Sequence, residues 1–555
     1  MLIPGKRIIH RWQKNRGTRE NSLDFFRPHH YTPKPDETIG CPVEDPFEQV
    51  STILSTLPPN PKQLPMKNRR PIDLKAISFF AMQKYGFKPE FPKAVIREVN
   101  AIHPDTSEAI GKNEMDLRSL LWSSIDNYDS EDLDQMEYCE RGPDHEIKVK
   151  IAIADVDHYV PKHSQADQYA AYNGSSVYTG IVTYPMLPDR LSKGISSLLP
   201  GQDCRAVIIE YTVLANGSVR HGNLYRAIVA NKAKLIYEEV GDWLEGSGPI
   251  PQKVRDVAGL EAQVRLQHEA ALRLKKFRAE QGALELETIE AEPVVENGTV
   301  KDLVLQKKNM ARNLIEEFMV AANGTTVAFL GNARIPMIQR IVRIPKHWDG
   351  IVLTAALYGE TLPDEPDAKA LTDFLVRQKE ADPVRFPDLS LTIVKLMGAG
   401  EYVPLDPGES PIGHFALAVT DYTHGTAPNR RYVDLIIQRL VKTVLDKAES
   451  PYSIEELVDQ SAWLTEKEKG SKKVERFMRK AAAAVLLQNS IGNSFEALVT
   501  GASDKGTYVR LITPPAEGRV MQGQQGLRVG EKVRVRLLKT DPMNGYVDFA
   551  CTGRA

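Results

Sequence analysis

The chain has 555 residues, of which 42% are hydrophobic and 26% charged, with 71 Lys and Arg against 73 Asp and Glu. A chain of this length exceeds what one hydrophobic core usually holds, so we expect three or four domains. The composition excludes collagen-like and mostly disordered proteins. Because the formal net charge is only −2, any surface that binds nucleic acid must be a local basic patch.

Two features bear on where the protein works. The longest apolar run, residues 481–487, is far shorter than the roughly 20 residues that span a bilayer, so we expect no contact with a membrane. The four cysteines are widely separated and show neither a disulfide framework nor the spacing of zinc ligands. We therefore predict a cytoplasmic location. The basic, acid-poor N-terminus keeps an organellar location open as the second possibility.

Residues 1–72 are predicted to form an irregular arm. Residues 1–71 hold 11 of the 36 prolines, and proline removes a backbone donor and disfavours helix in the residue before it. Apolar residues then recur with helical spacing in 73–87 and 92–102. This pattern predicts a small helical unit over residues 73–115 that resembles a helix-turn-helix.

Residues 116–489 mix predicted strands with predicted helices. Short β-rich runs come first, and long helical periodicity follows at residues 253–279, 310–330 and 429–447. The two patterns do not alternate regularly, so the sequence does not predict a doubly wound parallel sheet. We expect an α+β fold whose core combines sheet and helix.

Residues 490–555 are predicted to form a separate OB-type β-barrel, because five short alternating runs are separated there by turn residues. Lys532, Arg534 and Arg536 alternate along one run, so a period of two places them on one face. Tyr508 is a candidate platform for stacking the bases of single-stranded nucleic acid. A strand face that is merely solvated is the alternative interpretation.

The most informative segment is SSIDNYDSEDLDQ, residues 123–135. Its carboxylates follow an apolar stretch directly and include Asp126, Asp132 and Asp134. Carboxylates that converge repel one another unless a hard cation neutralises them. Mg²⁺ and Mn²⁺ suit such a site, because they take oxygen ligands and leave positions open for phosphate and water. A solvated acidic loop is the alternative.

A second informative segment covers residues 413–439. Pro428 suits the first residue of a helix, which would place Arg430 and Arg431 in the first turn, where the helix dipole disfavours cations. A phosphate bound at this end of the helix would explain both arginines. The alternative is that they pair with nearby carboxylates such as Asp434.

These segments together resemble the ribonuclease II/R family, the exoribonucleases with an RNB catalytic domain. Six motifs occur in the order found in that family: SIDNYDSEDLDQ, IADVDHYVP, VYTGIVTYPMLPDRLS, GALELETIEAE, LIEEFMVAAN and GHFALAVTDYTHGTAPNRRYVDLIIQR. The predicted barrel resembles the S1 domain that follows the RNB domain. The resemblance covers residues 116–555.

The resemblance implies a magnesium-dependent, hydrolytic 3′-to-5′ exoribonuclease that degrades single-stranded RNA processively to nucleoside 5′-monophosphates, with Mn²⁺ as the alternative ion. Protein partners stay unknown. The alternative from a different class is a catalytically silent RNB fold that binds RNA or serves a regulatory role. A phosphatase or nucleotide transferase using Asp132 and Asp134 is a third reading, which leaves the barrel unexplained.

The family's active site contains four aspartates. By motif match, Asp126, Asp132 and Asp134 take three of these positions, and Gln135 takes the fourth. Asp132 and Asp134 are also the predicted catalytic carboxylates, together with Arg430. Glutamine offers a neutral carbonyl oxygen in place of a charged one, so we expect metal to bind more weakly than in a site with four aspartates.

Other roles follow from the same resemblance. Arg430 matches the arginine that stabilises the attacked phosphate, and Tyr178 matches the tyrosine that stacks on the terminal nucleotide. Glu475 corresponds to a glutamate near the terminal ribose, and Arg431 joins the predicted RNA-binding residues. Family members of the ribonuclease II type also carry two cold-shock barrels before the RNB domain. Residues 1–115 are too few for two barrels of ~70 residues each.

Overall fold

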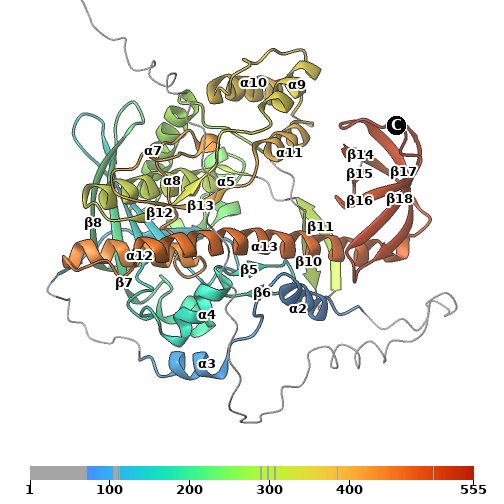
Figure 1. Ribbon diagram of the computed structural model, residues 1–555. Coiled ribbons are helices and arrows are strands. Elements are labelled where there is room, and N and C mark those ends of the chain that lie inside the picture. Colours follow the sequence, from blue (N-terminus) through green and yellow to red (C-terminus); the bar gives the residue numbers. More distant parts are fainter. Residues whose placement is uncertain are drawn as a thin grey trace, which may run out of the picture. The chain divides into compact units, whose positions relative to one another are not determined.

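The computed structural model describes residues 72–103, 111, 113–287, 291–296, 299–305, 308–383, 385–503 and 506–554. The predicted arm at residues 1–72 lies, except for its last residue, outside this part of the chain. Residues 71–555 form one unit by their internal contacts, and Figure 1 labels most of its elements. Every helix in the described part of the chain is too short or too polar to cross a bilayer.

A seven-stranded sheet forms the centre of this unit. Its strands are β1 (Glu114–Asp116), β2 (Ser123–Asp126), β3 (Gln135–Arg141), β4 (Ile147–Ala154), β7 (Asp203–Val213), β8 (Val219–Ala230) and β9 (Ala233–Ile236). They follow the order β1-β8-β7-β4-β3-β2-β9 in space. Only the outermost pairs, β1 with β8 and β2 with β9, are parallel, so the sheet is not doubly wound, as expected from the sequence.

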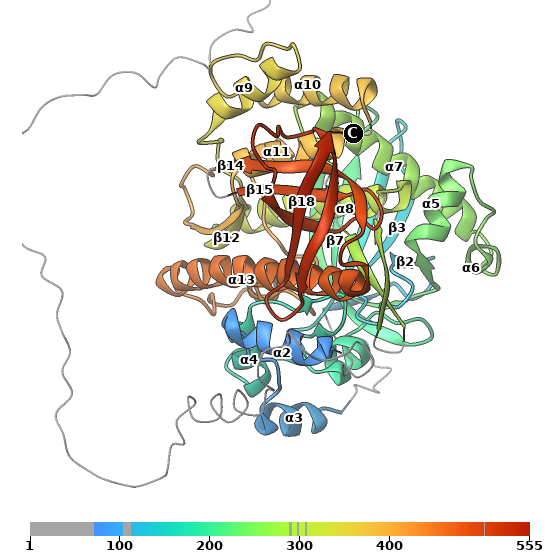
Figure 2. The same cartoon turned by 90° about the vertical axis from the view of Figure 1, so that its right-hand side faces the viewer.

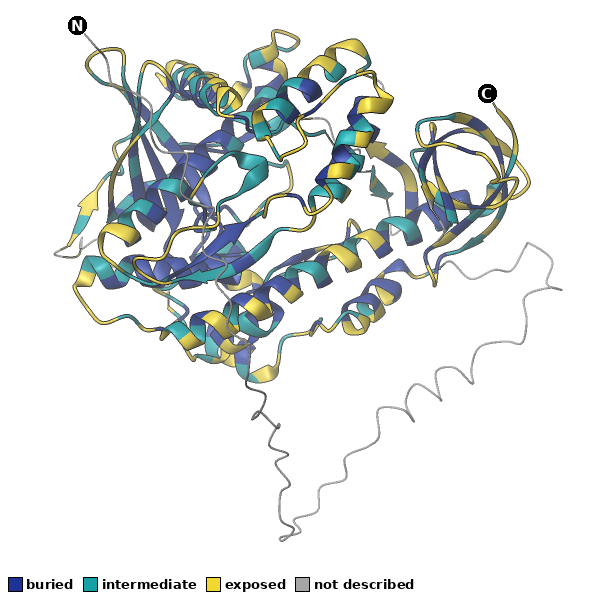
Figure 3. Ribbon diagram, turned by 45° about the horizontal axis from the view of Figure 1, so that its top comes forward, coloured by how far each residue is buried: buried dark blue, intermediate teal, exposed yellow. Residues whose placement is uncertain are grey.

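Three helices cover one face of this sheet. The covering helices are α5 (Tyr237–Glu245), α7 (Leu260–Glu280) and α8 (Met310–Asn332), and they contact β3, β7, β8 and β9. Within β4 every residue from 149 to 154 is buried. Figure 3 shows the strands of the sheet mostly in the colour of buried residues. The predicted combination of sheet and helix in an α+β core is thereby confirmed.

Smaller elements surround the core. They are α4 (Gln165–Asn173), β5 (Val177–Tyr178), β6 (Thr183–Tyr184), η3 (Leu191–Ile195), α6 (Gln252–Arg255), β10 (Ala291–Glu296), β11 (Thr299–Leu305), β12 (Met337–Ile341), α9 (Trp348–Leu357), α10 (Ala368–Ala381), α11 (Phe386–Met397), β13 (Glu401–Leu405) and η4 (Phe415–Leu417). β12 pairs with β13, and the three helices between them in the chain enclose a hydrophobic cluster of their own.

Helix α12 (Tyr432–Asp446) is buried along most of its length, yet it carries a charge in its middle. The side chain of Arg439 is 3% exposed and forms ion pairs of 2.8 Å with Asp157 and Asp167. It also donates to the hydroxyl of Tyr452 and to the carbonyl of Val160, both at 2.7 Å. These contacts tie the middle of α12 to α4 and to the segment after β4.

The two N-terminal helices pack in different places. α2 (Leu74–Lys84) begins after Asp73, whose side chain accepts hydrogen bonds from two backbone amides of its first turn. Its apolar face packs against α13 (Ile454–Leu486). α3 (Lys93–Asn100) contributes Val95 and Val99 to the main core and contacts α4. The limits of a separate helical unit at residues 73–115 stay a prediction.

Helix α13 (Ile454–Leu486) has 33 residues and connects two hydrophobic clusters. Its middle packs against α2 and β13, and its last turns contact β16, β17 and β18. Ala483 and Ala484 belong to the core of the C-terminal barrel, as does Leu487 in the short η5 (Leu487–Ser490). The helix therefore continues from the main core into the barrel.

The C-terminal strands form a closed barrel, as expected from their alternating pattern (Figure 2). They are β14 (Ser494–Ser503), β15 (Gly506–Leu511), β16 (Glu517–Gln522), β17 (Lys532–Asp541) and β18 (Tyr546–Arg554), in the order β14-β15-β16-β18-β17. Alternate residues such as Val533, Val535 and Phe549 fill the interior. The five-stranded OB-type barrel is confirmed.

The network around Arg439 generates a prediction for stability. Arg439→Met leaves Asp167 buried with its charge partner removed, so we expect the free energy of unfolding to fall by about 3–5 kcal/mol. Urea unfolding followed by circular dichroism measures this loss. Arg265→Met is the matched control, because Arg265 forms an ion pair with Glu261 on the exposed side of α7 and should cost little. Equal losses in the two variants would contradict the assignment.

Candidate active site

The acidic segment connects two neighbouring strands of the sheet. Asp126 ends β2 and Gln135 begins β3, and the two strands share the single ladder pair Ser123–Glu137. The Oδ1 atom of Asp126 accepts hydrogen bonds from the Asn127 amide and from a serine hydroxyl at position 130, both at 2.7 Å. The segment therefore curls back on Asp126 and leaves the other carboxylate oxygen of this residue unengaged by these two bonds.

Asp134 lies at the centre of the site. Its side chain is 2% exposed, and its two oxygens accept hydrogen bonds from the backbone amide of Asn429 at 2.9 Å and from Nε of Arg430 at 3.1 Å. Burial raises the pKa of Asp134 to about 7, although Arg430 acts in the opposite direction. The Arg430 side chain is 43% exposed, so it connects a buried carboxylate to solvent.

Asp132 and Tyr178 meet beside this ion pair. The Tyr178 hydroxyl donates to Oδ2 of Asp132 at 3.2 Å, and the tyrosine is 43% exposed in β5. Burial raises the pKa of Asp132, Arg430 lowers it, and the nearby charge of Asp126 raises it further. The structure thus brings together five of the residues singled out in the sequence: Asp126, Asp132, Asp134, Tyr178 and Arg430.

The start of α12 differs from the sequence expectation. The helix begins at Tyr432, so the prediction that Pro428 is its first residue is wrong. The reason is Asp434, whose buried side chain accepts hydrogen bonds from the backbone amides of Thr426 and Ala427, both at 2.8 Å. These bonds hold the preceding segment in a turn, because they satisfy amides that a longer helix would bond differently.

The two consecutive arginines face different partners. Arg431 is the N-cap residue of α12 and donates through Nε and Nη2 to Asp434 at 2.8 and 2.7 Å. Arg431 therefore pairs with a nearby carboxylate, which was the alternative left open by the sequence. Arg430, in contrast, points to Asp134. Neither arginine lies within the helix. Arg431, at the N-cap, still faces the positive end of the helix dipole, and its pair with Asp434 in the first turn offsets this unfavourable position.

A divalent metal ion fits this site only if few of its ligands come from the protein. In the described ranges, no group of three or more His, Cys, Asp or Glu side chains is arranged to hold a metal. Asp126 and Asp132 are nevertheless close enough to influence each other's charge, and Gln135, which follows Asp134 in the chain, is 6% exposed. Magnesium is commonly held by one or two carboxylates together with water and substrate phosphate, and these residues fit that arrangement.

Glu475 and the barrel residues lie on other elements. Glu475 is in the second half of α13 and accepts a hydrogen bond from the hydroxyl of Ser471 at 2.9 Å. Its place near the terminal ribose stays a prediction.

The basic residues of the barrel share one face, as expected. Lys532, Arg534 and Arg536 are exposed at alternate positions of β17, and Tyr508 in β15 is 37% exposed. Glu496 on β14 lies directly opposite Arg534, so part of the positive charge on this face is offset. RNA binding by these residues stays a prediction.

Sequence reasoning missed two residues near the site. Asn429 positions Asp134 through its backbone amide, and its side-chain oxygen accepts a hydrogen bond from Ser196 at 2.7 Å. Glu137 is fully buried in β3, where burial raises its pKa well above the ordinary range. The sequence could have identified Glu137, because period-two alternation places it on the same strand face as Gln135 and Cys139.

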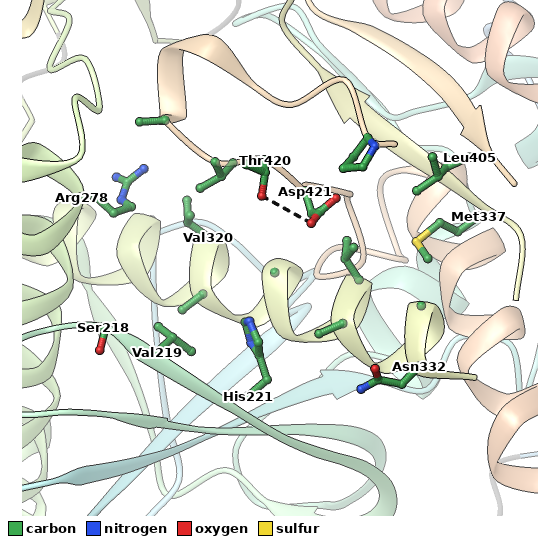
Figure 4. A pocket seen from close by; sticks show the side chains of 18 of the residues that line it. Ser218, Val219, His221, Arg278, Val320, Asn332, Met337, Leu405, Thr420 and Asp421 are labelled. Carbon is green, nitrogen blue, oxygen red and sulfur yellow. Dashed lines mark hydrogen bonds between the residues drawn. The ribbon is translucent and has the colours of Figure 1, made fainter. Parts of the chain in front are cut away.

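A cavity of about 660 Å³ lies away from these residues, between β8, α7, α8 and the segment that follows β13 (Figure 4). Apolar side chains such as Val320 line it together with His221, Arg278 and Asp421. None of the acidic residues of segment 123–135 is part of its lining. The cavity is therefore distinct from the candidate active site.

Comparison with protein families agrees with this geometry. The RNB domain matches residues 114–447, which is more than half of the chain and includes the acidic segment and both arginines. The chain belongs to the RNB domain family. The C-terminal S1 domain of RNase II-type exonucleases matches residues 493–552. This range is the closed barrel that follows the RNB domain.

Two curated relatives are ribonucleases R. The enzyme of Thermotoga maritima is 28% identical over 498 residues, covering 83% of this chain and 68% of the relative. Ribonuclease R 1 of Lactococcus lactis is 27% identical over 493 residues, covering 83% of this chain and 59% of the relative. The chain thus spans 59–68% of the length of these two proteins.

Solved structures share the fold at lower identity. Mycoplasma genitalium RNase R in complex with ribose-methylated single-stranded RNA has a TM-score of 0.77 at 22% identity, covering 86% of this chain and 78% of that one. Yeast Ssd1, a pseudonuclease, has a TM-score of 0.58 at 16% identity, covering 77% and 53%. The RNB fold alone therefore does not distinguish a nuclease from a silent relative.

The buried position of Asp134 generates a pH prediction. An unfolded aspartate loses its proton near pH 3.9, whereas the folded chain keeps the Asp134 proton until about pH 7. Ionisation therefore costs folding free energy, and the contribution of Asp134 to stability is largest below about pH 4 and is lost as the pH rises through about 7. Asp134→Asn removes this contribution.

Urea unfolding of the chain and of Asp134→Asn at pH 5 and pH 8, in buffer without divalent metal, measures the effect. We expect the unaltered chain to lose more stability than the variant between the two pH values. The comparison with the variant is necessary because other carboxylates and histidines titrate over the same range. An identical loss in both proteins would contradict the raised pKa of Asp134.

Proposed function

We propose that this chain is a hydrolytic 3′-to-5′ exoribonuclease. In this proposal it uses a divalent metal ion, Mg²⁺ or Mn²⁺, and degrades single-stranded RNA processively to nucleoside 5′-monophosphates in the cytoplasm. The observation that carries the proposal is the convergence of Asp132, Asp134 and Arg430 in an RNB domain. The ribonuclease R relatives, which are similar over most of this chain, support the same reaction class.

Arg430 would act on the phosphate. Its Nε atom bonds to Asp134, so its terminal amino groups can donate to the non-bridging oxygens of a phosphodiester at the half-exposed side of the pair. Donors fixed in this way stabilise the charge that develops on those oxygens during hydrolysis. Asp134 orients the guanidinium, and the amide of Asn429 holds Asp134 in turn.

Asp126 and Asp132, with the carbonyl oxygen of Gln135 and water, would hold the divalent ion. When bound, such an ion supplies a polarised phosphate and a water molecule that is more readily deprotonated. The hydroxyl of Tyr178 bonds to Asp132, which fixes the orientation of its half-exposed ring. A base stacked on this ring would place the terminal nucleotide without reading its identity.

RNA capture would begin away from the reaction site. The exposed face of Lys532, Arg534 and Arg536 with Tyr508 offers phosphate contacts and one stacking surface. Glu475 would contact the terminal ribose, whose 2′-hydroxyl distinguishes RNA from DNA. Arg431, in contrast, would serve RNA binding only indirectly, because its guanidinium holds Asp434 and the turn that carries Arg430.

A second function has specific support. Gln135 replaces a carboxylate, and the described residues contain no ready-made cluster of three acidic ligands, as expected for an RNB fold that binds RNA without cutting it. The likeness to a pseudonuclease fold makes this alternative concrete. It predicts a stable complex with RNA and no products.

The deciding experiment uses a single-stranded oligoribonucleotide labelled at its 3′-terminal nucleotide. We expect the chain to release labelled nucleoside monophosphate when Mg²⁺ or Mn²⁺ is present. Asp134→Asn should reduce hydrolysis by more than about 100-fold, while RNA affinity measured by gel shift changes little, because only the reaction site is altered. Intact RNA in a shifted complex, at every metal concentration, would instead establish the silent alternative.

Gln135 provides a separate prediction about metal. Gln135→Asp adds one ligand charge, so the Mg²⁺ concentration for half-maximal hydrolysis should fall by roughly tenfold. Isothermal titration with Mn²⁺ should show the same change in affinity without RNA. Gln524→Asp, on an exposed turn of the barrel, is the control and should leave both values unchanged. An unaltered metal requirement in Gln135→Asp would mean that this residue does not face the ion.

A further inference from the structure

Glu137 is a buried carboxylate that the proposed reaction does not use. It lies in β3, two residues after Gln135, and is 0% exposed. Both of its carboxylate oxygens are buried and accept no hydrogen bond from another residue, and in the described ranges no other carboxylate has both oxygens in this state. None of the ion pairs found in that part of the chain includes Glu137. A charged group is rarely left in this condition.

Two neighbouring side chains share the condition of Glu137. Ser123 is directly opposite Glu137 in the β2–β3 ladder, so both side chains project from the same face of the sheet, with Cβ atoms about 5 Å apart. Ser123 is 0% exposed, and its hydroxyl has no partner.

Gln267 reaches the same place from helix α7. It is 0% exposed, and its Nε2 atom donates to the backbone carbonyl of Glu137 at 3.2 Å. Because this bond fixes the amide, Oε1 of Gln267 is the atom left over, and it is buried without a partner. Three side chains from β2, β3 and α7 therefore place four unpartnered oxygens near one another.

The chemistry of these four atoms points to a cation. They are two carboxylate oxygens, one amide oxygen and one hydroxyl oxygen, which are the ligands that hard metal ions prefer. With Glu137 ionised, the hydroxyl hydrogen is the one donor among them, so the four oxygens cannot all find partners within the set. The set carries one negative charge, which a monovalent ion would neutralise and a divalent ion would exceed.

We propose that Glu137, Ser123 and Gln267 hold a buried monovalent metal cation, Na⁺ or K⁺, between β2, β3 and α7. This site is distinct from that of the divalent ion in the proposed reaction. Gln135 lies on the same face of β3, but Glu137 is two residues further along the strand, fully buried beneath Gln267 of α7.

The position gives the cation a structural consequence. Ser123–Glu137 is the single ladder pair between β2 and β3, and beyond it the strands separate toward Asp126 and Gln135. An ion bound at this pair would hold the two strands at a fixed distance where they begin to diverge. It would therefore set the spacing of the residues at the two ends of the acidic segment.

The test compares thermal unfolding of the full chain in NaCl, KCl and choline chloride at equal ionic strength, with a chelator of divalent ions present. We expect Na⁺ or K⁺ to raise the midpoint by about 3 °C or more over choline, in a saturable manner. Glu137→Gln should lose this response, because glutamine removes the charge and brings a donor for the oxygen of Gln267. Glu261→Gln, on the exposed side of the same helix, should keep it.

Equal midpoints in the three salts would overturn the proposal and leave a protonated Glu137 with a buried water as the explanation. A response that persists undiminished in Glu137→Gln would overturn it as well. Should that variant fail to fold, crystals of the unaltered chain grown with Rb⁺ or Tl⁺ decide the question. An anomalous peak between Glu137, Ser123 and Gln267 supports the site, and no peak there refutes it. These measurements involve no RNA, so they do not depend on nuclease activity.

Discussion

The arrangement of the candidate site depends on the ion pair between Asp134 and Arg430, which joins positions 296 residues apart in the chain. Asp134 is buried at the start of a central strand, and a buried carboxylate is costly unless donors surround it. Two donors come from the segment before α12, and that segment is held by Asp434 and by the contacts of Arg439 deeper in the helix. The sheet and α12 must therefore be correctly packed before Arg430 can take the phosphate-binding role that we propose for it.

The sequence predicts the features that local pattern determines. Period-two alternation with turn residues is sufficient for the C-terminal barrel, and the crowding of Asp126, Asp132 and Asp134 after an apolar strand identifies the acidic segment. The start of α12 was predicted incorrectly, because the bonds from Asp434 to the amides of Thr426 and Ala427 compete with the helix and leave no trace in apolar periodicity. The separate partners of Arg430 and Arg431 likewise depend on tertiary contacts that spacing cannot reveal.

Gln135 and Glu137 give β3 an unusual distribution of charge. Alternation along the strand places both on one face, so a neutral amide stands at the edge of the site and a carboxylate lies two residues deeper among buried side chains. The sequence analysis identified Gln135 and overlooked Glu137. A carboxylate within a predicted strand is expected to face solvent unless a helix is known to cover it, as α7 does here. An acidic side chain therefore lies beneath the acidic segment as well as within it.

The length of the single helix α13, 33 residues, determines how the barrel is oriented on the main core. At 1.5 Å per residue it is about 50 Å long, and each residue turns the chain by about 100°. Since it runs without a break from the main core into the barrel, its length determines the direction in which the exposed basic residues of β17 point. Substitutions in β17 can change the charge of this strand without changing its direction. A change in the length of α13 by anything other than whole turns would rotate the barrel, and β17 with it, about the helix axis.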